Sequence, residues 1–135
     1  MIVDTSAILA FFDLDEPDHE ALAAALSQAS EPLVVSPYVI AEVDYLIVSR
    51  LGVEAEIAAL RELAGGAWDL ATVDSLDLAR TVPILERYAD HAIGVADASN
   101  VVLADRYQTT TIATLDRRHF GVLRPLSGGY FAIVP

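Results

Sequence analysis

Length, composition and charge already exclude several classes of protein. The chain has 135 residues, 54% of them hydrophobic, which suits one domain spanning 1–135 and is too short for two ordinary ones. It has no cysteine, and all 8 basic residues are arginine, so thiolate metal sites, P-loop lysines and Schiff-base lysines are excluded. The formal net charge of −12 predicts long-range repulsion from a nucleic-acid backbone.

Neither a targeting signal nor a membrane span is predicted. The amino terminus carries an early acid, Asp4, and no basic stretch, unlike a secretory signal. No apolar run reaches the ~18 residues that a transmembrane helix needs, because Pro37 and Glu42 interrupt the best candidate. We therefore expect a cytoplasmic protein without a membrane partner.

In the first half of the chain, short apolar runs alternate with helical patterns. Ser36 followed by Pro37 is typical of a helix start, and Gly52 is typical of a helix end. The expected elements are strands at 2–3 and 33–35, and helices at 7–12, 17–29, 37–50 and 53–63.

The second half continues the alternation. Pro83 lies inside one helical pattern and predicts a kink there. The expected elements are strands at 68–73, 110–114 and 130–134, and helices at 75–88 and 95–107. Strands separated by helices of this length pair in parallel through right-handed crossovers. The sequence therefore predicts an α/β fold with one twisted, mainly parallel sheet, and a ligand site where the strand order reverses.

Acidic residues mark that edge of the predicted sheet. Asp4 and Asp116 follow the first and fourth strands, and Asp97 stands in the first turn of a helix. Glu42 falls at the edge of an apolar helix face, where a carboxylate is costly unless it is paired or bound to a metal. Together these residues predict an acidic pocket at the switch point.

Each acid also has an ordinary structural explanation. Asp4 can cap a helix, although Thr5 could cap equally well, and Asp97 can complement a helix dipole. Asp116 can form a surface ion pair with the arginines that follow it, and Glu42 can be a solvated flank residue. Only the joint pattern favours a site.

Ionised carboxylates crowded into one pocket repel one another unless a cation lies between them. With no cysteine and no clustered histidine, the ligand set suits a hard ion, Mg²⁺ or Mn²⁺. Such an ion lowers the pKa of bound water and stabilises in-line displacement at phosphorus. Asn100, three residues after Asp97, and Ser6, just past Asp4, are auxiliary polar candidates.

Four segments carry a resemblance to a known family: Ile2–Ala7, Ser36–Glu42, Asp97–Asn100 and Thr114–Phe120. They resemble a PIN domain, and most of all the VapC toxins of bacterial VapBC toxin–antitoxin systems. The resemblance covers essentially the whole chain and implies a five-stranded sheet of order 3-2-1-4-5.

The resemblance also implies an activity, a Mg²⁺- or Mn²⁺-dependent endoribonuclease. Asp4, Glu42, Asp97 and Asp116 match the family's acidic quartet, and Asn100 matches its common auxiliary position. It further implies three kinds of partner: an RNA substrate (tRNA or ribosomal RNA), a VapB-type antitoxin and a second copy of the chain. A basic inhibitor would complement the net charge of −12.

Two surface features remain open between a functional and a plain structural role. The apolar face of Ala55–Leu63 can serve a homodimer contact or the core. Arg117 and Arg118 follow Asp116 and can bind RNA, or can lie in a solvated surface turn. In the functional interpretation these arginines form a basic rim around the acidic centre, with His119 beside them and two further arginines, Arg106 and Arg124.

Three other classes compete with this interpretation. An RNA-processing or flap-type PIN nuclease usually carries an additional domain or zinc module, which 135 residues do not accommodate. A non-catalytic PIN-like binding module tends to lose one or more of the acids. A small acidic receiver domain needs a lysine, and the chain has none.

Overall fold

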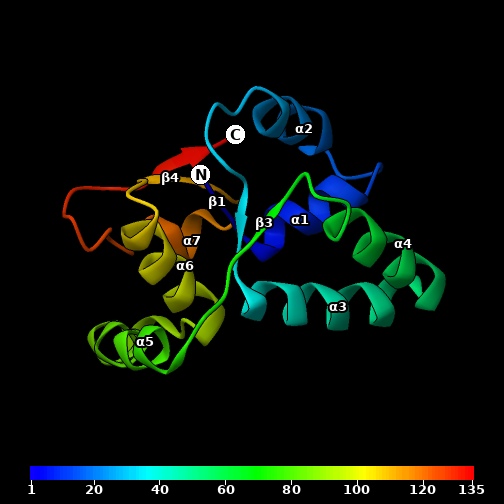
Figure 1. Cartoon of the computed structure of the whole chain (residues 1–135). Coiled ribbons are helices and arrows are strands. Elements are labelled where there is room, and N and C mark those ends of the chain that lie inside the picture. Colours follow the sequence, from blue (N-terminus) through cyan, green and yellow to red (C-terminus); the bar gives the residue numbers. More distant parts are fainter.

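The computed structural model describes residues 1–135 and is built on a five-stranded sheet with the order β3-β2-β1-β4-β5 (Figure 1). The strands are β1 Ile2–Val3, β2 Val34–Val35, β3 Asp69–Leu70, β4 Thr111–Ala113 and β5 Ala132–Val134. All neighbouring strands pair in parallel, so their carboxyl ends lie at one edge. The α/β class and the strand order 3-2-1-4-5 are confirmed.

The central strand β1 lies at the switch point of the sheet. Ile2 pairs with Val34 of β2 on one side and with Ile112 of β4 on the other. The backbone N–H of Asp4 donates to the carbonyl of Ala113 at 3.0 Å, which extends the contact with β4 by one residue. The sheet therefore delivers Asp4 to the crevice that opens where the strand order reverses.

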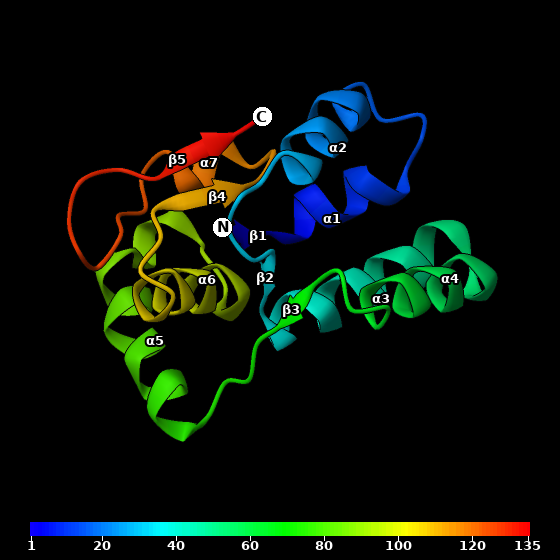
Figure 2. The ribbon, with the colours of Figure 1, turned by 45° about the horizontal axis from the view of Figure 1, so that its top comes forward.

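Helices cover both faces of the sheet (Figure 2). Alternate residues of a strand point to opposite faces, so Ile2 and Val34 join one core while Val3 and Val35 join the other. The first core packs against α5 and α6, and the second against α1 to α4. The bounds are α1 Thr5–Phe12, α2 His19–Ser27, α3 Pro37–Leu51, α4 Val53–Leu63, α5 Ser75–Arg87, α6 Val95–Arg106 and α7 Arg117–Phe120, with a 3-10 turn at Ala89–His91.

The start and end signals of α3 act as the sequence predicts. The Ser36 hydroxyl accepts the backbone N–H of Tyr38 at 3.2 Å, and Pro37 occupies the first helical position. Gly52 separates α3 from α4 with φ of 89°, a left-handed conformation that glycine adopts without steric cost.

The structure differs from the predicted elements mainly at their ends. The predicted strands 68–73 and 130–134 are only partly paired: β3 is confined to Asp69–Leu70, and β5 begins at Ala132 and reaches the predicted end at Val134. The helix expected at 17–29 is α2, which is two residues shorter at each end, and Pro83 lies inside an α5 that continues to Arg87. The 3-10 turn and α7 were not predicted, because one helical turn carries no hydrophobic period. No helix has the length and apolarity required to cross a membrane.

Candidate active site

A pocket of about 700 Å³ opens at the carboxyl ends of β1 and β4, at the switch point where the strand order reverses. Its walls come from α1, α3, the start of α6 and the segment after β4. The four acids that the sequence singled out all line it, and no arginine does; they are Asp4, Glu42, Asp97 and Asp116. The structure therefore brings together the residues that were predicted to meet.

Asp4 is the most enclosed of these acids, with only 4% of its surface exposed. It caps α1, but the bond from the Ser6 backbone N–H is long, at 3.5 Å. Stronger contacts come from side chains: the hydroxyls of Ser6 and Thr114 each donate to Oδ2 at 2.9 Å, and the Asn100 amide donates to Oδ1 at 3.1 Å. Helix capping is thus the weakest of its roles.

Burial raises the pKa of the Asp4 carboxyl above its ordinary value. Hydrogen bonds from Thr114 and Ser6 offset part of this rise, while the negative charge of Asp97 adds to it. A carboxylate in such a position makes the folded protein less stable when it ionises. Perturbed acids of this kind gather at functional sites, because stability alone would not select them.

Asp97 stands in the first turn of α6, and its Oδ2 accepts the backbone N–H of Gly94 at 3.0 Å. Burial also raises the pKa of this carboxyl, whereas the Gly94 N–H and the nearby His119 lower it. The charges of Asp116 and Glu42 raise it further. Asp97 therefore closes the first turn of its helix and also interacts electrostatically with the other acids of the pocket.

Glu42 differs from the two buried acids. The sequence placed it at the edge of an apolar face, where burial would be costly, but its side chain on α3 is exposed. Its Oε2 accepts a hydrogen bond from the Thr5 hydroxyl at 2.5 Å, which ties α3 to the residue directly after Asp4. The reason we gave for singling out Glu42 was therefore wrong, although its position in the pocket agrees with the prediction.

Asp116 does not form the surface ion pair that its sequence context allowed. Its Oδ1 caps α7 by accepting the backbone N–H groups of Arg118 and His119, both at 3.0 Å. Its Oδ2 lies 2.9 Å from His119 Nδ1, and the same nitrogen lies 3.5 Å from Asp97 Oδ2. When protonated, His119 supplies a positive charge between two of the acids.

The auxiliary residues form a buried polar network under the acids. The Ser6 hydroxyl accepts the backbone N–H of Leu115 at 2.9 Å, and the Thr114 hydroxyl accepts that of Asp116 at 2.9 Å. Asn100 is fully buried, and its Oδ1 has no hydrogen-bond partner. Sequence reasoning selected Ser6 and Asn100 and missed Thr114.

The missed residues had only weak signals in the sequence. Thr114 ends a predicted strand two residues before Asp116, and His119 stands three residues after it, one helical turn away once α7 is known. Thr5 looked like an alternative cap, and instead it holds Glu42.

The donor set agrees in chemistry with a hard cation such as Mg²⁺. Four carboxylates converge, and the unpartnered Oδ1 of Asn100 is a further oxygen acceptor buried beside Asp4. No three of the acidic or histidine side chains are already arranged to hold one ion, and His119 lies between Asp97 and Asp116. Asp4, Glu42, Asp97 and Asp116 are the residues that would hold such an ion.

The expected basic rim is not part of the pocket wall. Arg117 donates to the Pro135 carbonyl at 2.6 Å, and Arg106 forms an ion pair with Asp77 at 2.7 Å. Arg118 is exposed on α7, which is a helical turn rather than a loop. The basic side chain that does line the pocket is His119.

Comparisons with known proteins agree with this architecture. The model of the PIN domain family matches residues 1–123. Ribonuclease VapC26 of Mycobacterium tuberculosis is 57% identical over 135 residues, the full length of both chains. Among solved structures, VapC20 of M. tuberculosis, described as a Sarcin-Ricin loop cleaving toxin, superposes with a TM-score of 0.84 at 17% identity and covers 99% of this chain and 98% of its own.

FitAcB from Neisseria gonorrhoeae superposes with a TM-score of 0.66 at 20% identity, over 89% of this chain and 90% of its own. At these identities the two structures support the fold alone, whereas the family model and the VapC26 sequence span nearly all of the chain. This chain therefore belongs to the PIN-domain family and, within it, to the VapC proteins.

Proposed function

We propose that this protein is the toxin of a type II toxin–antitoxin system and acts as a metal-dependent endoribonuclease. The observation that carries the proposal is the convergence of four acids in one pocket at the switch point, two of them with a raised pKa. The full-length similarity to a protein named ribonuclease VapC26 supports RNA as the substrate.

The metal expected here is Mg²⁺, with Mn²⁺ as a substitute. Asp4 and Asp97 would hold it from the buried side of the pocket, and Glu42 and Asp116 from the open side. An ion of this kind supplies charge stabilisation at a phosphate and lowers the pKa of water.

The chain's own residues have distinct tasks in this account. Ser6, Thr114 and Asn100 fix both oxygens of Asp4, so that its orientation does not depend on the ligand. Glu42 is exposed and can accept a proton from water or orient it. His119 Nδ1 contacts Asp116 and Asp97 and so helps to position these two carboxylates.

Hydrolysis by water predicts products with a 5′-phosphate and a 3′-hydroxyl. The test is incubation of the purified protein with total RNA, in Mg²⁺ and in EDTA, followed by mapping of the product ends. We expect cleavage only with Mg²⁺, and the mapped sites then show whether tRNA or ribosomal RNA is cut. Cleavage in EDTA, or a 2′,3′-cyclic phosphate, would indicate acid–base catalysis by a histidine and contradict the proposal.

A VapB-type antitoxin is the expected protein partner. The net charge of −12 favours fast association with a basic inhibitor. We expect such an antitoxin to abolish RNA cleavage at equimolar concentration. Cleavage without any inhibitor of this type would instead favour a PIN-like RNA-processing nuclease, and absence of cleavage with every divalent metal would favour a non-catalytic PIN-like binding module.

A homodimer is the expected assembly, and α4 is the candidate contact. Within Ala55–Leu63, Ala59 and Leu63 are buried in the core, while Ile57 and Leu60 are 44% and 36% exposed. The helix therefore has both a core face and an apolar outer face. A Leu60→Glu variant should be monomeric by light scattering where the wild type is dimeric, and an unchanged mass would exclude this contact.

A further inference from the structure

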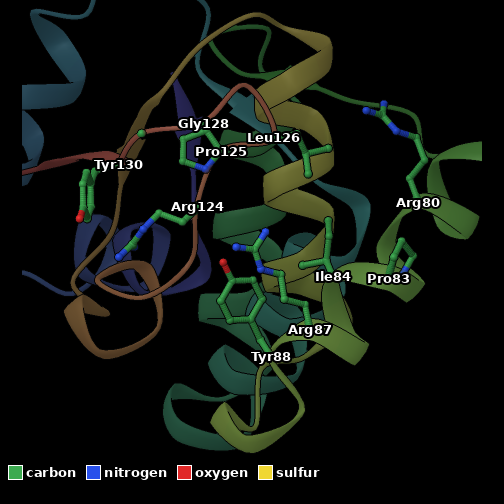
Figure 3. A pocket seen from close by; sticks show the side chains of 11 residues that line it. Arg80, Pro83, Ile84, Arg87, Tyr88, Arg124, Pro125, Leu126, Gly128 and Tyr130 are labelled. Carbon is green, nitrogen blue, oxygen red and sulfur yellow. The ribbon is translucent and has the colours of Figure 1, made fainter.

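A second large pocket lies beside α5, and its charge is opposite to that of the acidic pocket (Figure 3). Its volume is about 650 Å³, and its walls are the second half of α5 and the segment 124–130. Its lining includes 3 of the chain's 8 arginines and none of its 20 acidic residues. In a protein with a net charge of −12, this is a local reversal of charge.

The α5 wall provides an arginine without a carboxylate partner. Arg80, at the far end of the pocket in Figure 3, is neutralised by Asp105 at 2.5 Å. Arg87 forms no ion pair, is exposed, and lies over the Tyr88 ring at 5.4 Å from its centroid. The Arg87 guanidinium is therefore free to meet an anion beside an aromatic face.

The opposite wall also places an arginine over a tyrosine ring, here Arg124 over Tyr130. Arg124 donates to the backbone carbonyls of residues 121–123 at 2.8–3.0 Å, which fixes its guanidinium 4.1 Å from the Tyr130 ring centroid. Tyr130 itself is 74% exposed. The turn before it contains Gly128 and Gly129 at φ of 93° and 79°, values at which any other side chain is strained.

The two pockets are neighbours along the chain. Tyr88 lines the arginine pocket, and Gly94 lines the acidic one, only six residues later, a stretch that spans at most roughly 22 Å. On the other wall, His119 lines the acidic pocket and Arg124 lines the arginine pocket. An extended ligand of that length can therefore reach from one pocket to the other.

We propose that the arginine pocket binds one nucleotide of the RNA substrate, outside the scissile bond. Its phosphate lies beside Arg87, and its base stacks on the exposed ring of Tyr130. The inference rests on the proposed ribonuclease function and names where that site holds its substrate. Charge alone would also suit an acidic peptide, but the combination of guanidinium groups with aromatic rings matches single-stranded RNA, whose unpaired bases stack on such side chains.

This assignment resolves an electrostatic difficulty. The acidic pocket has no arginine in its wall, and the net charge opposes RNA at long range. A site with unpaired arginines next to it supplies the local attraction that the catalytic pocket lacks. The stacking contact is short-ranged and does not depend on net charge.

The test compares two variants that are matched in structure, Arg87→Gln and Arg61→Gln. Both arginines are exposed in the last turn of a helix, α5 and α4, and neither forms an ion pair, but only Arg87 lines the pocket. Binding of a labelled 12-nucleotide single-stranded RNA is measured by fluorescence anisotropy in EDTA, over a range of salt concentrations. Arg87→Gln should weaken binding and lower the slope of log K against log salt by about 0.7, as for one lost phosphate contact.

A third variant, Tyr130→Leu, tests the stacking contact, with an expected loss of affinity of about 5- to 150-fold. In cleavage assays with Mg²⁺, Arg87→Gln should raise KM and leave kcat unchanged, because the contact is made equally in the ground and transition states. Melting curves of all three variants show whether folding is intact.

The proposal is overturned if Arg87→Gln and Tyr130→Leu bind RNA with the same affinity and the same salt slope as Arg61→Gln. Unchanged RNA binding with lost binding of a VapB-type antitoxin would assign the pocket to a protein partner and overturn it as well. If the wild type cleaves RNA in either of these cases, the proposed function stands. If the wild type neither binds nor cleaves RNA, the proposed function fails too.

Discussion

The acidic pocket and the arginine pocket are similar in size and differ in how their charges are held. Asp4 and Asp97 are largely buried, their pKa values are raised by that burial, and fixed hydrogen bonds orient them. Arg87 is exposed and free of ion pairs, and its position costs the fold little. The contrast is between acids that are held by burial and fixed hydrogen bonds, at a cost in stability, and an arginine that stays solvated, as the proposed roles in catalysis and in substrate binding would require.

The largest expected effect comes from the buried acid. Asp4→Asn keeps the size and removes the charge, and it should lower RNA cleavage by about 10²–10⁴-fold, the range for loss of an essential catalytic group. The new amide can donate to the unpartnered Oδ1 of Asn100, so folding should survive. Cleavage rate and melting temperature are measured on the same preparation.

The matched control is Asp74→Asn. Asp74 also caps a helix, accepting the backbone N–H groups of Leu76 and Asp77 at 2.8 and 2.9 Å, but it lies outside the pocket. It should lose at most the ~0.5–2 kcal/mol of a helix cap and keep its activity. If both variants behave alike, Asp4 is only a cap and the contrast between the pockets is lost.

Glu42→Gln probes the exposed side of the acidic pocket, with an expected loss of cleavage of about 10²-fold. The amide oxygen can still accept the Thr5 hydroxyl, so stability should be unchanged, or higher because repulsion with Asp97 is relieved. Glu62→Gln, an exposed glutamate outside this pocket, is the control. A destabilised but active Glu42→Gln enzyme would show that the residue serves the fold.

The pH dependence of stability tests the cost of burial. Because the folded pKa of Asp4 lies above the ordinary 3.8, the folded protein holds a proton that the unfolded chain has already released. This stabilising contribution is complete below the unfolded pKa and is lost as pH rises through the folded pKa. In EDTA, the melting temperature of Asp4→Asn relative to wild type should therefore increase from about pH 4 upward. If the difference in melting temperature between Asp4→Asn and the wild type does not vary with pH, burial of the ionised Asp4 carboxylate does not destabilise the fold.

The smallest effect is expected on α7, where the sequence predicted RNA-binding arginines. Arg118 is exposed, and one lost phosphate contact should lower the salt slope of RNA binding by about 0.7 in Arg118→Gln. Arg117 is held by the Pro135 carbonyl, so Arg117→Gln should change the slope less. Equal slopes for both variants and the wild type would confine RNA binding to the arginine pocket.

The fold was accessible from the sequence because its signals are local. Alternating strands and helices dictate parallel pairing, and Ser36, Pro37 and Gly52 act as the predicted helix boundaries. Strand ends were harder, since the predicted run continues past the last residue of β3 and starts before the first residue of β5. The single turn of α7 depends on the Asp116 cap, which no periodic pattern reveals.

The acids of the site could be predicted because a parallel sheet brings strand ends to one edge. Their surroundings could not, because they depend on tertiary contacts between distant segments. Thr114 at the end of β4 reaches Asp4 at the end of the neighbouring strand β1, and His119 of α7 reaches Asp97 of α6. The arginine pocket likewise joins α5 to the segment 124–130, from which the sequence had suggested only Arg124, as part of a rim around the acids.

The central claim is that the acidic pocket is a divalent-cation site, and calorimetric titration with Mn²⁺ tests it most directly. Wild type and Asp74→Asn should bind Mn²⁺ equally, and Asp4→Asn and Asp97→Asn should bind it more weakly, because each removes a carboxylate from the pocket wall. Equal Mn²⁺ affinity in all four proteins, with intact folding, would contradict the assignment of a metal to these residues.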